Sequence, residues 1–72
     1  MNSLDLFIVG NFSGNGSVED KICKYQFTPT KFLVMRSGES RWGFYNLDKV
    51  DFITIDGVTI YRKEELHFHV NN

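Results

Sequence analysis

His67 and His69 are the residues of this 72-residue chain whose spacing most directly suggests chemistry. If residues 65–70 form a strand, both imidazoles project from one face, because side chains alternate across a strand. Two histidines so placed can share a metal ion, but a site needs further ligands, and Glu65 is the only obvious neighbour. The simpler interpretation is an exposed polar face on a terminal strand. We therefore expect no metal site and no cofactor, and metal binding through His67 and His69 stays a second alternative function.

Cys23 is the one candidate nucleophile. It lies close in sequence to Lys21 and Lys24, whose charges would favour the reactive thiolate. Nucleophilic catalysis also requires an oriented base, and none is identifiable. If this segment is a strand, Cys23 alternates with Tyr25 and Phe27 on an inward face, where a free cysteine is commonly inert.

Residues 10–17 are rich in glycine and asparagine, a composition that occurs in loops holding phosphate groups. The segment lacks both the Walker pattern with its Lys-Ser/Thr ending and the Gly-x-Gly-x-x-Gly spacing. We interpret it as a connecting loop. Because the acidic residues are also scattered one per turn, we expect the chain not to be an enzyme.

The middle of the chain combines positive charge with aromatic rings. The whole chain has a net charge of −1, yet residues 21–41 carry five basic residues against one acidic residue, a net charge of +4. Trp, Tyr and Arg dominate the hot spots of protein interfaces. Small β-barrels that bind single-stranded nucleic acid use rings to stack bases and cations to hold phosphates. This region therefore predicts a binding surface of one of these two kinds.

A protein interface is our first interpretation. We expect it to comprise Arg36, Arg41, Trp42, Phe44 and Tyr45, extended by Phe52 and Tyr61. The alternative is a nucleic-acid surface comprising Lys21, Lys24, Lys31, Arg36, Arg41 and Trp42. Nucleic-acid-binding domains are usually markedly basic, so the slightly acidic chain favours the first interpretation. The prediction is a non-enzymatic adaptor or inhibitor that docks onto a larger protein through this aromatic and basic face or through a sheet edge.

Residues 50–63 are the hairpin around which the predicted fold is organised. The pair Asp56-Gly57 favours a two-residue type I′ turn, which needs positive φ at both positions. The turn predicts five opposed pairs: Ile55–Val58, Thr54–Thr59, Ile53–Ile60, Phe52–Tyr61 and Asp51–Arg62. This register places four aliphatic residues on one core-facing side: Ile53, Ile55, Val58 and Ile60. A slip of one residue would set Asp51 opposite Lys63 and mix the two faces, so we predict against it.

Four further segments alternate as strands do: 4–9, 31–36, 41–47 and 65–70. Residues 17–27 are ambiguous, because Ser17 and Asp20 have the spacing of a helix cap whereas residues 23–27 alternate. We favour at most one helical turn at 17–21, followed by a strand. The result is a mainly all-β fold of six or seven short antiparallel strands in a single domain of residues 1–72. The strands form either a small barrel or a strongly bent sheet.

Composition also suggests where such a chain works. It has a single cysteine, no recognisable secretory signal and no apolar run long enough to cross a bilayer. The cytoplasm, without membrane contact, is the expected location. If the sheet stays open, an apolar edge strand could also join copies of the chain into a homo-oligomer.

Overall fold

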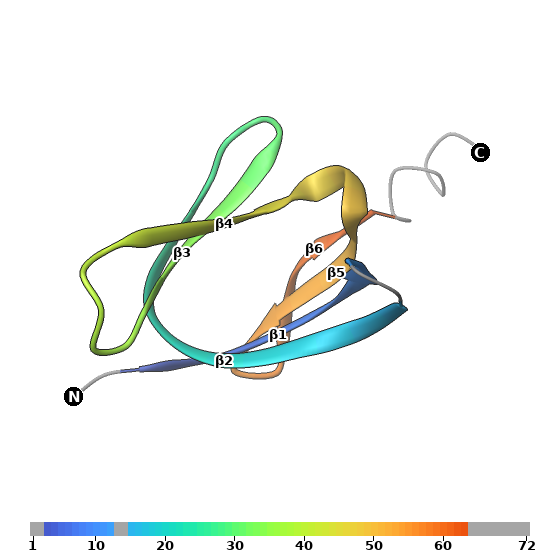
Figure 1. The fold of residues 1–72 in the computed structure, drawn as a ribbon. Helices are drawn as coiled ribbons and strands as arrows, with labels where there is room; N and C mark the ends of the chain where they lie inside the picture. Colours follow the sequence, from blue (N-terminus) through green and yellow to red (C-terminus); the bar gives the residue numbers. More distant parts are fainter. Residues whose placement is uncertain (1–2, 13–14, 64–72) are drawn as a thin grey trace.

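Six antiparallel strands form one sheet (Figure 1). The computed structural model describes residues 3–12 and 15–63. The strands are β1 (Leu4–Asn11), β2 (Asn15–Phe27), β3 (Lys31–Arg36), β4 (Trp42–Asn46), β5 (Val50–Ile55) and β6 (Val58–Arg62), with a 3-10 turn η1 (Leu47–Lys49) before β5. Their order across the sheet is β4-β3-β2-β1-β5-β6. Within the described residues the sheet is open, so the strongly bent sheet is the alternative that the structure confirms.

The bend lies in β2, the longest strand, with 13 residues. Its first half pairs with β1 and its second half with β3, and a bulge interrupts the register between Ile22 and Lys24. A bulge bends its strand and increases the local twist. As a result β3 and β4 cross over β1, β5 and β6, and the two halves of the sheet face each other (Figure 1).

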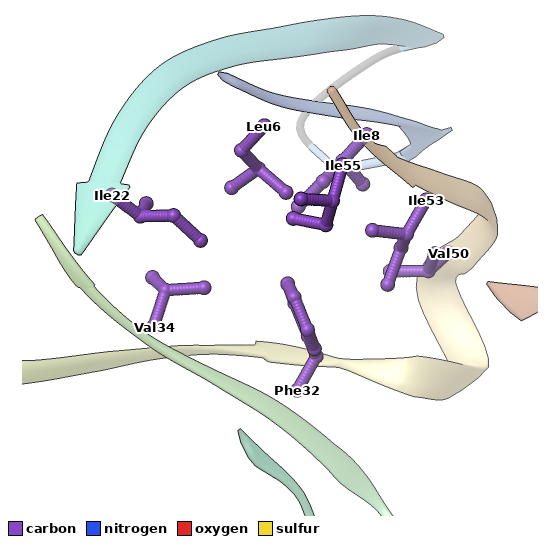
Figure 2. Packing of buried hydrophobic residues seen from close by; sticks show 8 residues of the cluster. All are labelled: Leu6, Ile8, Ile22, Phe32, Val34, Val50, Ile53 and Ile55. Carbon is purple, nitrogen blue, oxygen red and sulfur yellow. The ribbon is translucent and has the colours of Figure 1, made fainter. Parts of the chain in front are cut away.

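The core fills the space between the two halves. Eight apolar side chains are buried: Leu6, Ile8, Ile22, Phe32, Val34, Val50, Ile53 and Ile55. Figure 2 shows Phe32 and Val34 of β3 pointing toward side chains of β1 and β5. These residues follow the alternation predicted for 4–9 and 31–36. The half-buried Phe7 and Val9 on the other face of β1 agree with its central place in the sheet.

The β5–β6 hairpin confirms the predicted turn, since Asp56 has φ 51° and Gly57 has φ 82°. The first two pairs, Ile55–Val58 and Thr54–Thr59, are also as predicted. The remaining pairs are wrong. A bulge beyond Thr54 places Ile53 opposite Tyr61 and Phe52 opposite Arg62. The amide of Lys63 donates to the carbonyl of Asp51 at 2.9 Å, so the one-residue slip does occur at the open end of the hairpin.

This bulge changes which side chains of β6 meet the core. Ile53 and Ile55 are buried as predicted, but Val58 is 64% exposed, so its predicted core position is wrong. Ile60 and Tyr61 are both half-buried and both pack against the core. Two consecutive residues can contact the same core because the extra residue of a bulge interrupts the alternation.

Residues 17–21 are part of β2, so the predicted helical turn is wrong. All five pair with β1, from Ser17 opposite Val9 to Lys21 opposite Asp5. Val18 packs against the core and Ile22 is buried. Their i, i+4 spacing suits a strand face and a helix face alike, so the pairing with β1 is what identifies the strand. Pairing with the central strand outweighs the local capping pattern. The predicted loop at 10–17 is shorter than expected for the same reason, since β1 ends at Asn11 and β2 begins at Asn15.

Candidate binding surface

The half-sheet of β2, β3 and β4 presents aromatic rings on the face opposite the core. Trp42 is 45% and Phe44 57% exposed. The register places Trp42 opposite Met35 and Phe44 opposite Leu33, and both of these β3 side chains are half-buried. We call the following six side chains the outer patch: Lys24, Lys31, Leu33, Met35, Trp42 and Phe44. Leu33 and Met35 were absent from the predicted surface, although their alternation with the core residues of β3 was a usable signal.

Two lysines stand beside the rings of the outer patch. The Lys24 Nζ lies 5.7 Å from the centroid of the Trp42 ring, and the Lys31 Nζ lies 5.2 Å from that of Phe44. Lys24 is placed by the sheet register, because it pairs with Met35, which in turn pairs with Trp42. A cation over an exposed ring is stabilised by about 0.5–1 kcal/mol. The patch therefore combines apolar area with positive charge.

Arg36 and Arg41 lie apart from the outer patch. The Arg36 Nε donates to the Asp20 carboxylate, and this hydrogen bond, with the charge of Asp20, raises the pKa of Arg36 above its ordinary value. Both arginines line a hollow of about 210 Å³ on the core side of the β3–β4 hairpin, together with Glu39, Gly43 and Tyr45. Tyr45 packs against the core, with its ring 5.7 Å from that of Phe12. Of the residues predicted for the interface, Trp42 and Phe44 therefore lie on the outer face of this half-sheet. Arg36, Arg41 and Tyr45 lie on its core side.

Phe52 and Tyr61 do not extend the outer patch. Phe52 belongs to the other half-sheet, where its ring lies 6.2 Å from that of Phe7 and 5.8 Å from the Arg62 guanidinium carbon. Tyr61 is half-buried, and its ring lies 6.0 Å from that of Phe27 of β2. The bulge in the hairpin separates the two residues that the sequence placed opposite each other.

Lys21 is engaged with Asp5 on the neighbouring strand. The Lys21 Nζ lies 2.5 Å from Asp5 Oδ1, and this hydrogen bond, followed by the charge of Asp5, raises the pKa of Lys21 above its ordinary value of 10.5. The pKa is raised in the folded state, so the stabilisation is present below pH 10.5 and is lost as pH rises through the folded pKa. Among the predicted nucleic-acid residues, Lys21 thus has a carboxylate partner already.

Replacing Asp5 with alanine is expected to lower the pKa of Lys21 toward 10.5, because the substitution removes both the hydrogen-bond acceptor and the negative charge. The measurement is a titration of the Lys21 ¹³Cε chemical shift in the folded chain. Asp51→Ala, which removes an exposed carboxylate elsewhere on the sheet, is the control and should leave that titration unchanged. Identical Lys21 titrations in the wild-type chain and Asp5→Ala would contradict the ion pair.

Cys23 is the candidate for catalysis that the structure describes. Cys23 is exposed at the β2 bulge, with its Sγ 3.5 Å from the Met35 carbonyl oxygen, so its predicted inward orientation is wrong. The bulge interrupts the alternation on which that prediction depended. His67 and His69 lie outside the described residues. Within residues 3–12 and 15–63, no three His, Cys, Asp or Glu side chains gather as metal ligands would.

No helix in the described part of the chain combines the length and apolar character needed to cross a bilayer. Comparisons of the chain with protein-family models, curated proteins and solved structures found no match. The outer patch and the strand that carries its rings are therefore the basis for a functional proposal.

Proposed function

We propose that this chain is a non-enzymatic protein-binding module, of the adaptor or inhibitor kind, which docks onto a larger protein through the outer patch. The observation that carries the proposal is the exposure of Trp42 and Phe44 side by side on one face of β4. Large exposed apolar side chains that gather on one face typically mark interaction sites. Neither ring belongs to the buried core, so both are free to contribute to binding.

The charge of the outer patch indicates what kind of partner surface fits it. Lys24 and Lys31 lie beside the two rings, within the segment of net charge +4. Complementary charges across an interface accelerate association and reject wrong partners. A partner that offers apolar side chains flanked by carboxylates therefore suits the patch best.

Single-stranded nucleic acid is the second candidate, because rings and cations on one sheet face are also how such strands are held. Two observations favour the protein partner. Both lysine ammonium groups lie over the rings on which bases would have to stack. Arg36 and Arg41 lie beside the hollow on the core side, and Arg36 is paired with Asp20. These cations therefore do not line up with the lysines as a single track for phosphates.

Trp42→Ala and Phe44→Ser are each expected to weaken partner binding by about 30-fold or more, the effect of losing a hot spot of about 2 kcal/mol. Both side chains are exposed, so the free energy of unfolding should change by only about 0.5 kcal/mol. The immobilised chain is used to retain its partner from a native lysate. The affinity of each variant for the retained protein is then measured by calorimetry.

Val58→Ser is the matched control, because Val58 is exposed but lies on β6, away from the outer patch. Equal affinity for Trp42→Ala, Phe44→Ser and Val58→Ser would show that the outer patch is not the interface. Retention that disappears after nuclease treatment, or that falls steeply with salt, would support nucleic acid instead.

A further inference from the structure

Within the described residues, the strand β4 that carries the rings has an unpaired edge. β4 stands first in the sheet order, and among the described residues it pairs only with β3. In an antiparallel pair, directly opposed residues alternate between those that exchange both backbone hydrogen bonds and those that exchange none. The bonds at the ends of β3 therefore determine which backbone groups of β4 face outward.

Two backbone hydrogen bonds, one at each side of β3, indicate the same alternation of bonded and non-bonded pairs. The amide of Leu47 donates to the carbonyl of Thr30 at 2.9 Å, and the amide of Thr28 donates to the carbonyl of Lys31 at 2.9 Å. The first bond means that Gly43 and Tyr45 exchange hydrogen bonds with β3. The groups that point to the open edge of β4 are the N–H and C=O of Trp42 and Phe44 and the N–H of Asn46. The C=O of Asn46 belongs to the start of η1, which Asn46 caps.

Nothing in β4 protects this edge from pairing. Proteins commonly guard an edge strand with charged residues, proline or a bulge. The sequence Trp-Gly-Phe-Tyr-Asn contains no charge and no proline, and its pairing with β3 is regular. In the described part of the chain, the backbone groups of Trp42 and Phe44 and the N–H of Asn46 form no hydrogen bond with a loop or a side chain.

We infer that the partner contributes an extended segment that adds to the sheet as a strand beside β4, with acidic side chains on the side of Gly43. This inference rests on the proposed function and specifies how the partner is held. In such complexes main-chain hydrogen bonds supply affinity, and sites for alternate side chains supply specificity.

The two faces of β4 select different side chains on the added strand. Directly opposed residues share a face of the sheet, so residues opposite Trp42 and Phe44 would pack against their rings. The residue opposite Gly43 would project to the core side, where a Cβ on Gly43 would meet no atom within 4 Å. The hollow there is lined by Arg36, Glu39 and Arg41. Arg36 is already paired with Asp20, so Arg41 is the guanidinium open to a partner carboxylate. The fitting segment therefore alternates apolar and acidic residues.

Charge argues for a partner segment over a second copy of this chain. Two β4 strands paired edge to edge would bring the two basic segments of net charge +4 together. Lys24, Lys31 and Arg41 form no ion pair with any residue that the structure describes, so their charges would repel across that interface. Acidic side chains on the side of Gly43 would instead lie near Arg41 and reduce the net positive charge of this segment.

The first test uses the acetylated and amidated peptide Val-Glu-Val-Glu-Val-Glu-Val and amide hydrogen exchange measured by NMR. With peptide at about ten times Kd, exchange at Trp42, Phe44 and Asn46 is expected to slow about tenfold. Exchange at Gly43 and Tyr45, which already bond to β3, should change little. The same peptide with lysine in place of glutamate should bind about tenfold more weakly or not at all.

The second test removes one outward-facing amide without touching a ring. Asn46 has φ −75° and ψ 124°, a backbone conformation that proline adopts readily. Asn46→Pro deletes an N–H that faces the open edge and leaves the β3–β4 hydrogen bonds in place. Asn46→Ala is the matched control, because it keeps the N–H. We expect the proline variant to bind the peptide about tenfold more weakly than the alanine variant, with equal or higher melting temperature.

Equal binding by Asn46→Pro and Asn46→Ala, or failure of the acidic peptide to bind the wild-type chain, would overturn strand addition. Loss of the lysate partner in Trp42→Ala would still support the outer patch in that case, so the two proposals fail separately. Slow exchange at Trp42, Phe44 and Asn46 in the concentrated chain alone, with a dimer in sedimentation velocity, would overturn the acidic segment in favour of a second copy.

Discussion

Replacing Phe32 with alanine is expected to lower the free energy of unfolding by about 3–5 kcal/mol, the usual cost of deleting a buried ring. The side chain is fully buried at the centre of the core (Figure 2). Its ring lies 4.8 Å from that of Phe27 and 5.7 Å from that of Tyr25. A chain of this length has a total stability of about 4–10 kcal/mol, so much of the folded population would be lost.

Urea denaturation followed by far-UV circular dichroism measures this loss. Leu33→Ala is the matched control, because Leu33 is the next residue of β3 but points to the half-buried outer side. We expect the control to cost about 1 kcal/mol. Similar losses in Phe32→Ala and Leu33→Ala would mean that the two faces of β3 are assigned incorrectly.

The position of Phe32 also explains how the core supports the binding surface. Among the described strands, β3 and β4 are joined to the remainder of the sheet by pairing only through β2 (Figure 1). Packing of Phe32 and Val34 against β1 and β5 is therefore what holds the half-sheet over the other half (Figure 2). Loosening that packing would be expected to disturb the outer patch without touching it, so binding is better tested at Trp42, Phe44 and Asn46.

Much of the core could be predicted from alternation alone. A strand with one face buried repeats its apolar residues every second position, and β1 and β3 follow this rule. The turn at Asp56-Gly57 was predictable because few residue pairs accept positive φ at both positions. The alternation predicted for residues 41–47 puts Trp42 and Phe44 on one face of the strand, and both rings are exposed in the structure.

What could not be predicted depends on three bulges. They lie between Val9 and Gly10, between Ile22 and Lys24, and between Ile53 and Thr54. Each shifts the register by an extra residue, and alternation carries no mark of where this happens. The exposure of Cys23 and the separation of Phe52 from Tyr61 both follow from such shifts. The sequence also does not show that Lys24 and Lys31 lie beside the rings while Arg36 and Arg41 line the hollow. Predicting this would require the register across β2, β3 and β4.

Gly10→Ala is expected to lower the free energy of unfolding by about 3 kcal/mol, because it introduces a clash with backbone atoms. Gly10 lies opposite the bulge that Asp51 forms in β5, where a Cβ would sit 2.3 Å from the Lys49 carbonyl oxygen and 3.0 Å from the Val50 Cα. Neither atom can rotate away as a side chain could. The strand β1 and the start of β5 would have to separate, and Val50, which is buried in the core, would move with them.

Gly16→Ala is a close control for this substitution, since Gly16 is the partner of Gly10 in the β1–β2 pair. A Cβ on Gly16 would have no atom within 4 Å, so we expect a change within about 0.5 kcal/mol or a slight stabilisation. Urea denaturation of both variants measures their free energies of unfolding. If Gly10→Ala proved as stable as Gly16→Ala, the close approach of β1 to the η1–β5 junction would be refuted. Gly10, which the sequence analysis placed in a connecting loop, would then have no packing role in the sheet.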